Sequence, residues 1–206
     1  ALERVSKRFG SVDVIKDLSL EIGAGEFVVF LGPSGSGKTT LLRMLAGTLE
    51  SDTGEILPGH GLKVGYFAQE HETLDLEKTV LENMQRSAPD LTDTQARSVL
   101  GAFLFSGDDS AKPAGVLSGG ERTRLALAGL IVSSANVLLL DEPTNNLDPA
   151  SRAEVLDAIR RYEGAIILVS HDEGAVRALD PDRVLLLPDG DEDIWSDDYA
   201  DIIALA

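Results

Sequence analysis

Cysteine is absent from this 206-residue sequence, which excludes disulfides and thiolate metal sites. No apolar run approaches the ~20 residues of a membrane-spanning helix, and the first residues lack the apolar core of a signal peptide. Basic residues are few and scattered, 18 against 35 acidic ones, and the net charge is −17. Such a field repels nucleic acid, so we expect no direct nucleic-acid binding by this acidic domain. The composition is typical of a cytoplasmic globular protein.

A glycine-rich segment organises the sequence. Residues 27–31 form an apolar run with the length and composition of a buried strand, and residues 41–45 are apolar at helical spacing. The intervening pattern G-x-x-x-x-G-K-T fits a P-loop, whose backbone N–H groups and helix N-terminus bind phosphates. Lys38 would reach the β- and γ-phosphates, and the Thr39 hydroxyl would bind Mg²⁺. The sequence therefore predicts a nucleoside triphosphate site at Gly32, Pro33, Ser34, Gly35, Ser36, Gly37, Lys38, Thr39 and Thr40.

Two further segments carry phosphate or metal chemistry. Residues 117–121, LSGGE, lead into an apolar helix, so Ser118, Gly119 and Gly120 would present a second set of N–H groups to an anion. One nucleotide in one subunit would not need two such sites. The buried strand NVLLLDE ends in Asp141, which suits Mg²⁺, and Glu142, which would polarise an attacking water. Both acids would lie at the strand end beside the P-loop.

Phe9 and His171 each leave two interpretations open. An aromatic residue at the end of a strand ahead of the P-loop would stack on an adenine ring, but a core phenylalanine fits the local pattern equally well. His171 directly follows a buried strand at 165–169, where such sheets bind ligands. Taken alone, a histidine at this position is more often structural.

Strands alternate with helices along the chain, which predicts an α/β fold with a largely parallel core sheet and an N-terminal antiparallel β segment. We expect one domain of 206 residues, with an α/β core at 1–69 and 117–206 and an inserted helical subdomain at 70–116. Within the insert, Thr92 followed by Gln95 is a capping-box pattern.

Toward the C-terminus, Pro149 is expected to begin a helix that ends near Arg160. The last strand is expected at 184–187, followed by a short C-terminal helix for which Trp195 and Tyr199 would be packing anchors.

Together these motifs resemble the nucleotide-binding domain of ABC ATPases. Residues 32–40 match the Walker A motif, 117–121 the signature motif, 137–142 Walker B with its catalytic glutamate, and 146–148 the D-loop. The resemblance implies ATP as substrate with Mg²⁺, Glu142 as general base or water orienter, and Lys38 on the β/γ charge. It further implies Gln69 as the Q-loop residue near Mg²⁺, His171 as the switch histidine facing the γ-phosphate, and Phe9 as the adenine-stacking aromatic.

The same resemblance implies a partner. ABC ATPase domains work as sandwich dimers, with ATP between the P-loop of one domain and the signature motif of the other, which would account for the two phosphate sites. A second ATPase domain, in a homodimer or as a paired domain, is therefore expected. In an isolated monomer the site would be incomplete, and turnover would be slow.

The subfamily differs between the two parts of the chain. From about residue 57 onward the sequence is similar to the second ATPase domain of ABC-F proteins, which act on the ribosome; DEPTNNLD at 141–148 carries most of that likeness. Residues 1–55 are more similar to the ATPase subunit of an importer, which would bind membrane subunits. We therefore hypothesise an excised or chimeric domain joined near residues 55–61. The alternative function is a transporter motor, or an engineered chimeric domain that binds nucleotide with weak or no turnover.

Overall fold

The computed structural model describes residues 1–68, 74–145, 147–199 and 203. The chain divides into two compact units: unit 1 contains Ala1–Tyr66, Asn136–Glu142 and Glu163–Ala206, and unit 2 contains Phe67–Ala135 and Pro143–Tyr162. Residues 117–135 and 143–162 thus group with the helical segments, whereas the sequence placed them with the α/β core. Within the described residues, no helix has the length and apolar character that a membrane span requires.

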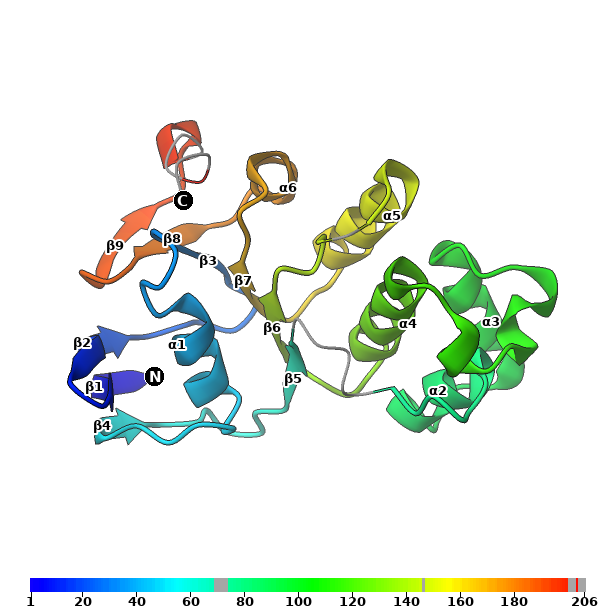
Figure 1. Ribbon diagram of the computed structural model, residues 1–206, viewed down its shortest axis with the longest axis horizontal. Coiled ribbons are helices and arrows are strands. Elements are labelled where there is room, and N and C mark those ends of the chain that lie inside the picture. Colours follow the sequence, from blue (N-terminus) through cyan, green and yellow to red (C-terminus); the bar gives the residue numbers. More distant parts are fainter. Residues whose placement is uncertain (69–73, 146, 200–202, 204–206) are drawn as a thin grey trace. The chain divides into compact units, whose positions relative to one another are not determined.

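A three-stranded antiparallel sheet opens unit 1. Strands β1 (Leu2–Phe9) and β2 (Val12–Leu20) form a hairpin, and β4 (Thr53–Ile56) pairs with the other edge of β1 (Figure 1). Leu2, Val5 and Leu18 of this sheet are buried in the core of unit 1. This confirms the expected N-terminal antiparallel segment.

The larger sheet has six strands in the order β5-β6-β7-β3-β8-β9. Its strands are β3 (Phe27–Leu31), β5 (Val64–Phe67), β6 (Val137–Asp141), β7 (Ala165–Val169), β8 (Arg183–Leu186) and β9 (Asp191–Ile194). Strand β3 pairs in parallel with β7 and β8, and β7 pairs in parallel with β6. The carboxyl ends of these four strands therefore meet at one edge of the sheet, as in other α/β folds. The expected α/β fold with a mostly parallel sheet is confirmed.

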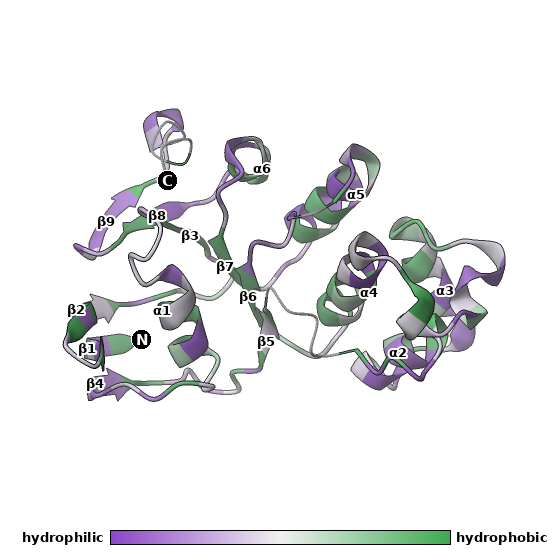
Figure 2. Ribbon diagram, in the orientation of Figure 1, coloured by the Kyte–Doolittle hydropathy of each residue, from purple (hydrophilic) through white to green (hydrophobic). Residues whose placement is uncertain are grey.

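Strand β9 corrects the expectation that the last strand ends at 187. Residues 191–194 pair antiparallel with β8, and Arg183 on β8 forms an ion pair with Glu192 on β9. All four β9 residues are exposed, and in Figure 2 this strand is mostly hydrophilic whereas the central strands are hydrophobic. The segment has no buried face to reveal it, because its strand conformation depends on pairing with its neighbour. Of the expected C-terminal helix, the structure describes a 3₁₀ turn at Asp197–Tyr199, where the ring centroids of Trp195 and Tyr199 lie 6.3 Å apart, and most of the rest lies outside the described residues.

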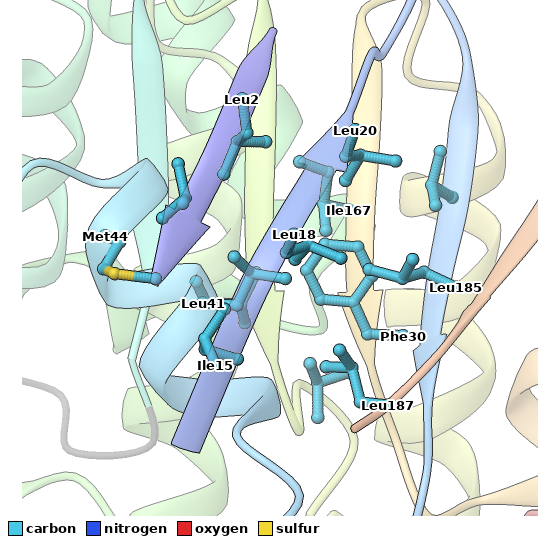
Figure 3. Packing of buried hydrophobic residues seen from close by; sticks show 14 of the residues in the cluster. Leu2, Ile15, Leu18, Leu20, Phe30, Leu41, Met44, Ile167, Leu185 and Leu187 are labelled. Carbon is cyan, nitrogen blue, oxygen red and sulfur yellow. The ribbon is translucent and has the colours of Figure 1, made fainter. Parts of the chain in front are cut away.

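The core of unit 1 lies between the two sheets and helix α1 (Lys38–Leu45). Leu18 from β2, Phe30 from β3 and Leu41 from α1 converge there with Ile167 and Leu185 (Figure 3). Fully burying a side chain of this size contributes roughly 1.5–3 kcal/mol. Helix α1 is thereby fixed against the sheet, and its N-terminus is held at the end of β3. Unit 1 also contains helix α6 (Glu173–Leu179), which the sequence analysis did not predict.

Unit 2 is built from helices α2 (Val80–Ser87), α3 (Asp93–Ala102), α4 (Gly119–Ile131) and α5 (Pro149–Arg160), with short 3₁₀ turns at Gly107–Ala111 and Ala114–Val116. The predicted capping box at α3 is confirmed: Thr92 Oγ1 accepts a hydrogen bond from the Gln95 N–H, and Gln95 Oε1 accepts one from the Thr92 N–H. Helix α5 begins and ends where the sequence predicted.

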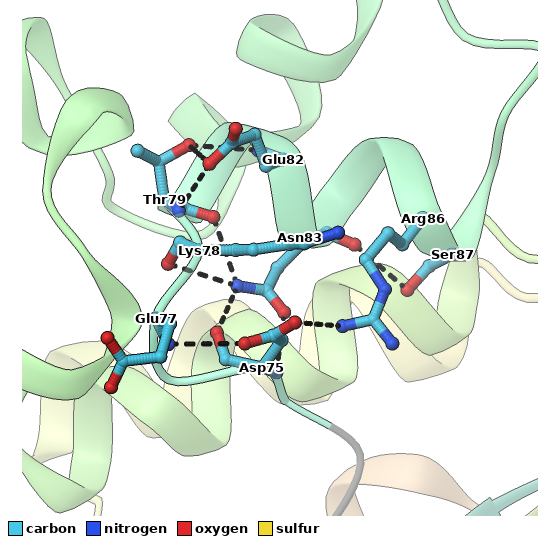
Figure 4. Close-up of polar contacts among 8 residues, drawn as sticks. All are labelled: Asp75, Glu77, Lys78, Thr79, Glu82, Asn83, Arg86 and Ser87. Atoms are coloured by element: carbon cyan, nitrogen blue, oxygen red, sulfur yellow. Dashed lines mark hydrogen bonds and ion pairs between the residues drawn. The ribbon is translucent and has the colours of Figure 1, made fainter.

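The start of α2 is fixed by a buried asparagine. Asn83 Nδ2 donates to the carbonyls of Asp75 and Thr79, and its Oδ1 accepts from the Asp75 N–H (Figure 4). Thr79 and Glu82 also form a capping box at the start of α2. Because the Asn83 amide both donates and accepts, the loop before α2 keeps its backbone groups satisfied within unit 2.

Candidate functional site

The P-loop leaves the carboxyl end of β3 through a glycine whose backbone conformation and close surroundings disfavour any side chain. Gly32 has φ +146°, and a Cβ there would lie 2.2 Å from the Leu187 carbonyl oxygen and 2.8 Å from Ser36 Oγ. Ser36 Oγ is buried and has no hydrogen-bond partner among the described residues. A buried hydroxyl with unused hydrogen-bonding capacity inside a glycine loop is suited to an oxygen-rich ligand.

Helix α1 is the only α-helix in the described part of the chain whose first turn has neither a side-chain cap nor an acidic residue. Its N-cap is Gly37, in the left-handed conformation. The other five begin at Thr79, Thr92, Ser118, Asp148 and Asp172, and each of these side chains accepts a backbone N–H. The first N–H groups of a helix need a partner, and an anion suits them because of the helix dipole. The N-terminus of α1 thus retains backbone N–H groups that can donate to a phosphate.

Lys38, the first residue of α1, points back over the loop. Its Nζ donates to the carbonyl oxygens of Gly32 and Pro33, the latter at 3.1 Å, and the residue is 7% exposed. Burial lowers the pKa of this ammonium, while the nearby Glu142 and Asp141 carboxylates oppose that shift. The positive charge therefore lies inside the loop. Pro33, Ser34 and Gly35 form the exposed tip, and Thr40 is half-buried in the first turn of the helix.

Asp141 ends strand β6 and meets the P-loop through Thr39. The Asp141 carboxylate is 3% exposed. Burial raises its pKa, and a hydrogen bond with the Thr39 side chain and the charge of Lys38 both act in the opposite direction. A hydroxyl and a carboxylate in contact at a phosphate-binding loop are the two protein oxygens that a Mg²⁺ bound with phosphates requires. The donor set therefore fits Mg²⁺.

Glu142 adopts the left-handed conformation, with φ 52°, directly after β6. Its N–H donates to the Val169 carbonyl at the end of β7, at 2.9 Å, which turns the side chain toward the sheet edge. The residue is 8% exposed, and neither carboxylate oxygen has a hydrogen-bond partner among the described residues. Burial raises its pKa to about 7, against an opposing contribution from the His171 backbone. A buried carboxyl that titrates near neutral pH is suited to accept a proton.

His171 reaches this carboxyl from the end of β7. Its Nε2 lies 3.4 Å from Glu142 Oε1, and its side chain is 43% exposed. Burial and the charge of Lys38 lower the pKa of the imidazole, whereas Asp141 opposes them. Lys38, Thr39, Asp141, Glu142 and His171, which span 134 positions of the sequence, thus belong to one edge of one sheet in unit 1.

Phe9 lies at the end of β1 and is 50% exposed. The interpretation as a core phenylalanine is therefore wrong. The Lys7 ammonium lies 5.8 Å from the centroid of the ring, and a ring exposed to this extent is available for stacking.

The second predicted phosphate site belongs to unit 2. Ser118 is the N-cap of α4: its Oγ accepts from the Glu121 N–H at 3.3 Å, and Glu121 Oε2 accepts from the Ser118 N–H at 2.7 Å. The Ser118 side chain is therefore engaged within its own helix. Gly119 is exposed, and a Cβ on it would meet nothing within 4 Å. This leaves room for a partner to approach.

Two motif positions lie outside the described residues: Gln69, predicted near Mg²⁺, and Asn146 of the D-loop. Sequence reasoning also missed two features that shape the site. Leu187 presents the carbonyl that closes over Gly32, and Val169 holds the backbone of Glu142. No local sequence pattern marks either residue, because each acts through its main chain from the end of another strand.

A glycine loop between a central parallel strand and an uncapped helix, with an aspartate at the end of β6, which is separated from β3 by β7, defines a P-loop nucleotide-binding fold. The comparison with known families gives the more specific assignment. The ABC transporter family matches residues 15–145, well over half of the chain, and the chain belongs to this family as an ABC-type ATPase domain.

Several curated proteins are similar to most of this chain. It is 41% identical over 186 residues to the protein YdiF of Bacillus subtilis, covering 90% of this chain and 29% of YdiF. It is 39% identical to the ATP-binding protein Uup of Escherichia coli, covering 83% of this chain and 28% of Uup. It is 38% identical to ABC transporter F family member 5 of Arabidopsis thaliana, covering 93% of this chain and 28% of that protein. The chain thus spans about 30% of the length of these relatives.

Solved structures support the fold. A dimeric structure of the ATP-binding cassette MJ0796, in a post-hydrolysis state with ADP and Pi, superimposes with a TM-score of 0.76 at 24% identity. It covers 94% of this chain and 97% of that one.

Proposed function

We propose that this chain binds Mg·ATP at its P-loop and hydrolyses it when paired with a second ATPase domain. The observation that carries the proposal is the buried Glu142 carboxyl, without a hydrogen-bond partner among the described residues, at the same sheet edge as Lys38 and Asp141. His171 Nε2 lies 3.4 Å from this carboxyl, and a water next to a γ-phosphate would provide the hydrogen-bond donor that the described residues do not.

Each residue has a distinct role in this proposal. When bound, Mg·ATP supplies the phosphoryl group. Lys38 turns from the Gly32 and Pro33 carbonyls to the β/γ-phosphates, and the uncapped N–H groups of α1 bind the same oxygens. Thr39 and Asp141 would hold Mg²⁺, and family resemblance assigns Gln69 to the same role. Glu142 accepts the proton of the attacking water, and His171 faces and orients the γ-phosphate.

The second domain would complete the site. Ser118, Gly119 and Gly120 of the partner domain would close over the γ-phosphate, which accounts for the exposure of Gly119 in this chain. The dimeric structures of MJ0796 favour such a pairing. Phe9 would stack on the adenine from the P-loop side.

The test is ATP-dependent dimerisation of Glu142→Gln, measured by light scattering. The amide removes the base but leaves Asp141 and Thr39 intact, so ATP should bind, remain uncleaved and trap the dimer. Two copies each carry −17, and their repulsion is screened within ~10 Å at 0.1 M salt, so dimerisation should be more complete at moderate than at very low ionic strength.

Lys38→Ala is the matched control for this test. It should abolish or severely reduce ATP binding in calorimetry, because the triphosphate loses its main cationic contact, and it should remain monomeric with ATP. If Glu142→Gln also stays monomeric at saturating Mg·ATP, across salt and at high protein concentration, the sandwich proposal is wrong.

For the physiological role, the relative named ABC transporter F family member 5 favours an ABC-F-like, translation-related protein that acts in the cytoplasm on the ribosome. The family name and the importer-like first segment favour the alternative, a motor subunit bound to membrane subunits. Cosedimentation with ribosomes, compared with binding to detergent-solubilised transmembrane subunits, distinguishes the two. The chimera hypothesis remains a prediction; individual relatives align over 83–93% of the chain, which gives it no support.

A further inference from the structure

A large apolar cavity lies within unit 1, away from the P-loop. Its volume is about 990 Å³. The lining includes Val137 and Ala165, which begin β6 and β7, and Met44 and Leu45 at the end of α1. The P-loop follows the opposite, carboxyl end of β3. The cavity is therefore a separate site from the one that would hold ATP.

The walls of the cavity are aliphatic, and its rim exposes large apolar side chains. Leu20, Met44, Leu139 and Ile167 form part of the buried lining. Leu57, Leu62 and Val64 line the same cavity and are 41%, 40% and 38% exposed.

These rim residues are three of nine large hydrophobic residues that are exposed in the described part of the chain. Their gathering at one cavity is a feature of ligand-binding or interaction sites. Pockets for small molecules span roughly 300–1,000 Å³ and are mostly apolar with a few polar groups, as here.

The charged residues around the cavity select the kind of ligand. Its described lining contains Glu21, Glu50 and Glu163, together with His60, but no lysine or arginine. All three glutamates are exposed at its margin. The terminal ammonium of Ala1 also lines the cavity, and it donates to the Leu57 carbonyl at 2.8 Å. The carboxylates favour a cation and disfavour a fatty acid or another anionic amphiphile.

We propose that this cavity binds a small cationic amphiphile, a molecule with an aliphatic or aromatic body and one positively charged amine. The body would occupy the space between Leu20, Met44 and Ile167, and the amine would face the glutamates at the margin. This site is independent of the proposed ATP hydrolysis, so each can fail without the other.

The experiment titrates the 206-residue chain with decyltrimethylammonium by calorimetry, below its micelle-forming concentration and at about 0.1 M salt to screen general attraction to the acidic surface. Decyl sulfate and tetramethylammonium serve as parallel probes, because each removes one half of the proposed recognition. We expect one saturable site for decyltrimethylammonium, at least about tenfold weaker binding of decyl sulfate, and no measurable binding of tetramethylammonium.

Two matched tryptophan variants test the location. Leu62→Trp would fill the cavity from its exposed rim and should weaken the binding of decyltrimethylammonium at least about tenfold. Val116→Trp places the same side chain at a 69% exposed position in unit 2 and should leave binding unchanged. Leu57→Trp repeats the test if Leu62→Trp does not fold by circular dichroism.

A triple variant tests the charge assignment. Glu21→Gln, Glu50→Gln and Glu163→Gln together should reduce the preference for the cation over decyl sulfate to within about threefold. Decyl sulfate bound as tightly as the cation by the unmodified chain would overturn the assignment of the ligand class. Binding of several decyltrimethylammonium ions per chain without saturation would show surface association and overturn the site. Equal weakening of decyltrimethylammonium binding by Leu62→Trp and Val116→Trp would do the same.

Discussion

Glu142→Gln should stabilise the nucleotide-free chain, and by an amount that grows with pH. In the folded chain burial raises the pKa of this carboxyl from 4.5 to about 7. The folded state therefore binds the proton more tightly than the unfolded state does. The stability associated with that proton is fully present below pH 4.5 and is lost as pH rises through about 7. Glutamine resembles the protonated side chain at every pH and loses nothing.

The magnitude follows from the size of the shift. At about 1.4 kcal/mol per pKa unit, a shift from 4.5 to about 7 corresponds to about 3 kcal/mol above neutral pH, to the nearest kcal/mol. Part of the stability difference between Glu142→Gln and the unmodified chain is already present in mildly acidic solution. The increment in this difference between about pH 5.5 and 8.5 is therefore ~2 kcal/mol. The increment is the diagnostic quantity, because any constant effect of the amide on packing cancels from it.

Urea unfolding followed by circular dichroism, without nucleotide or Mg²⁺, measures the difference between the variant and the unmodified chain at each pH. Glu55→Gln on β4 is the control, because this glutamate is exposed and its replacement should give no comparable increment. A free-energy difference between Glu142→Gln and the unmodified chain that stays constant from acidic to alkaline pH would refute the reasoning. The Glu142 carboxylate would then be solvated or paired in solution.

Three further changes have expected outcomes. Phe9→Ala should weaken ATP binding by ~1–3 kcal/mol in calorimetry and leave the melting temperature unchanged, since the ring is half exposed. A lower melting temperature with unchanged ATP affinity would contradict the stacking role. Gly32→Ala should destabilise the chain by at least about 2 kcal/mol in urea, because its Cβ would meet the Leu187 carbonyl at 2.2 Å; unchanged stability would show that the loop relaxes freely. Thr92→Ala should cost about 1 kcal/mol through loss of the α3 cap, and Thr92→Ser should restore most of it.

Local sequence patterns predicted the elements whose start and stop signals lie in their own sequence. The strand at 27–31 is bounded by a glycine turn and the P-loop, and the helix at 149–160 begins with an aspartate cap and a proline, so both appear where the sequence placed them. Strand β9 was missed because its conformation depends on β8. For the same reason, sequence patterns supplied the residue types of the site but not their geometry. The left-handed conformation of Glu142 and its approach to His171 depend on how β6 and β7 pair.

The order of strands in the larger sheet has a consequence for how the protein is made. Strand β3 is synthesised well before both of its neighbours, because β7 and β8 begin more than 130 residues later in the sequence. Contacts this distant in sequence form slowly and are the last available during vectorial synthesis. The capped helices of unit 2, by contrast, complete most of their hydrogen bonds locally. When α4 has been synthesised, the strongly apolar β3 therefore still lacks both of its partner strands. The P-loop gains its supporting carbonyl only when Leu187 has been added, so the complete phosphate site forms only after β8 has been synthesised.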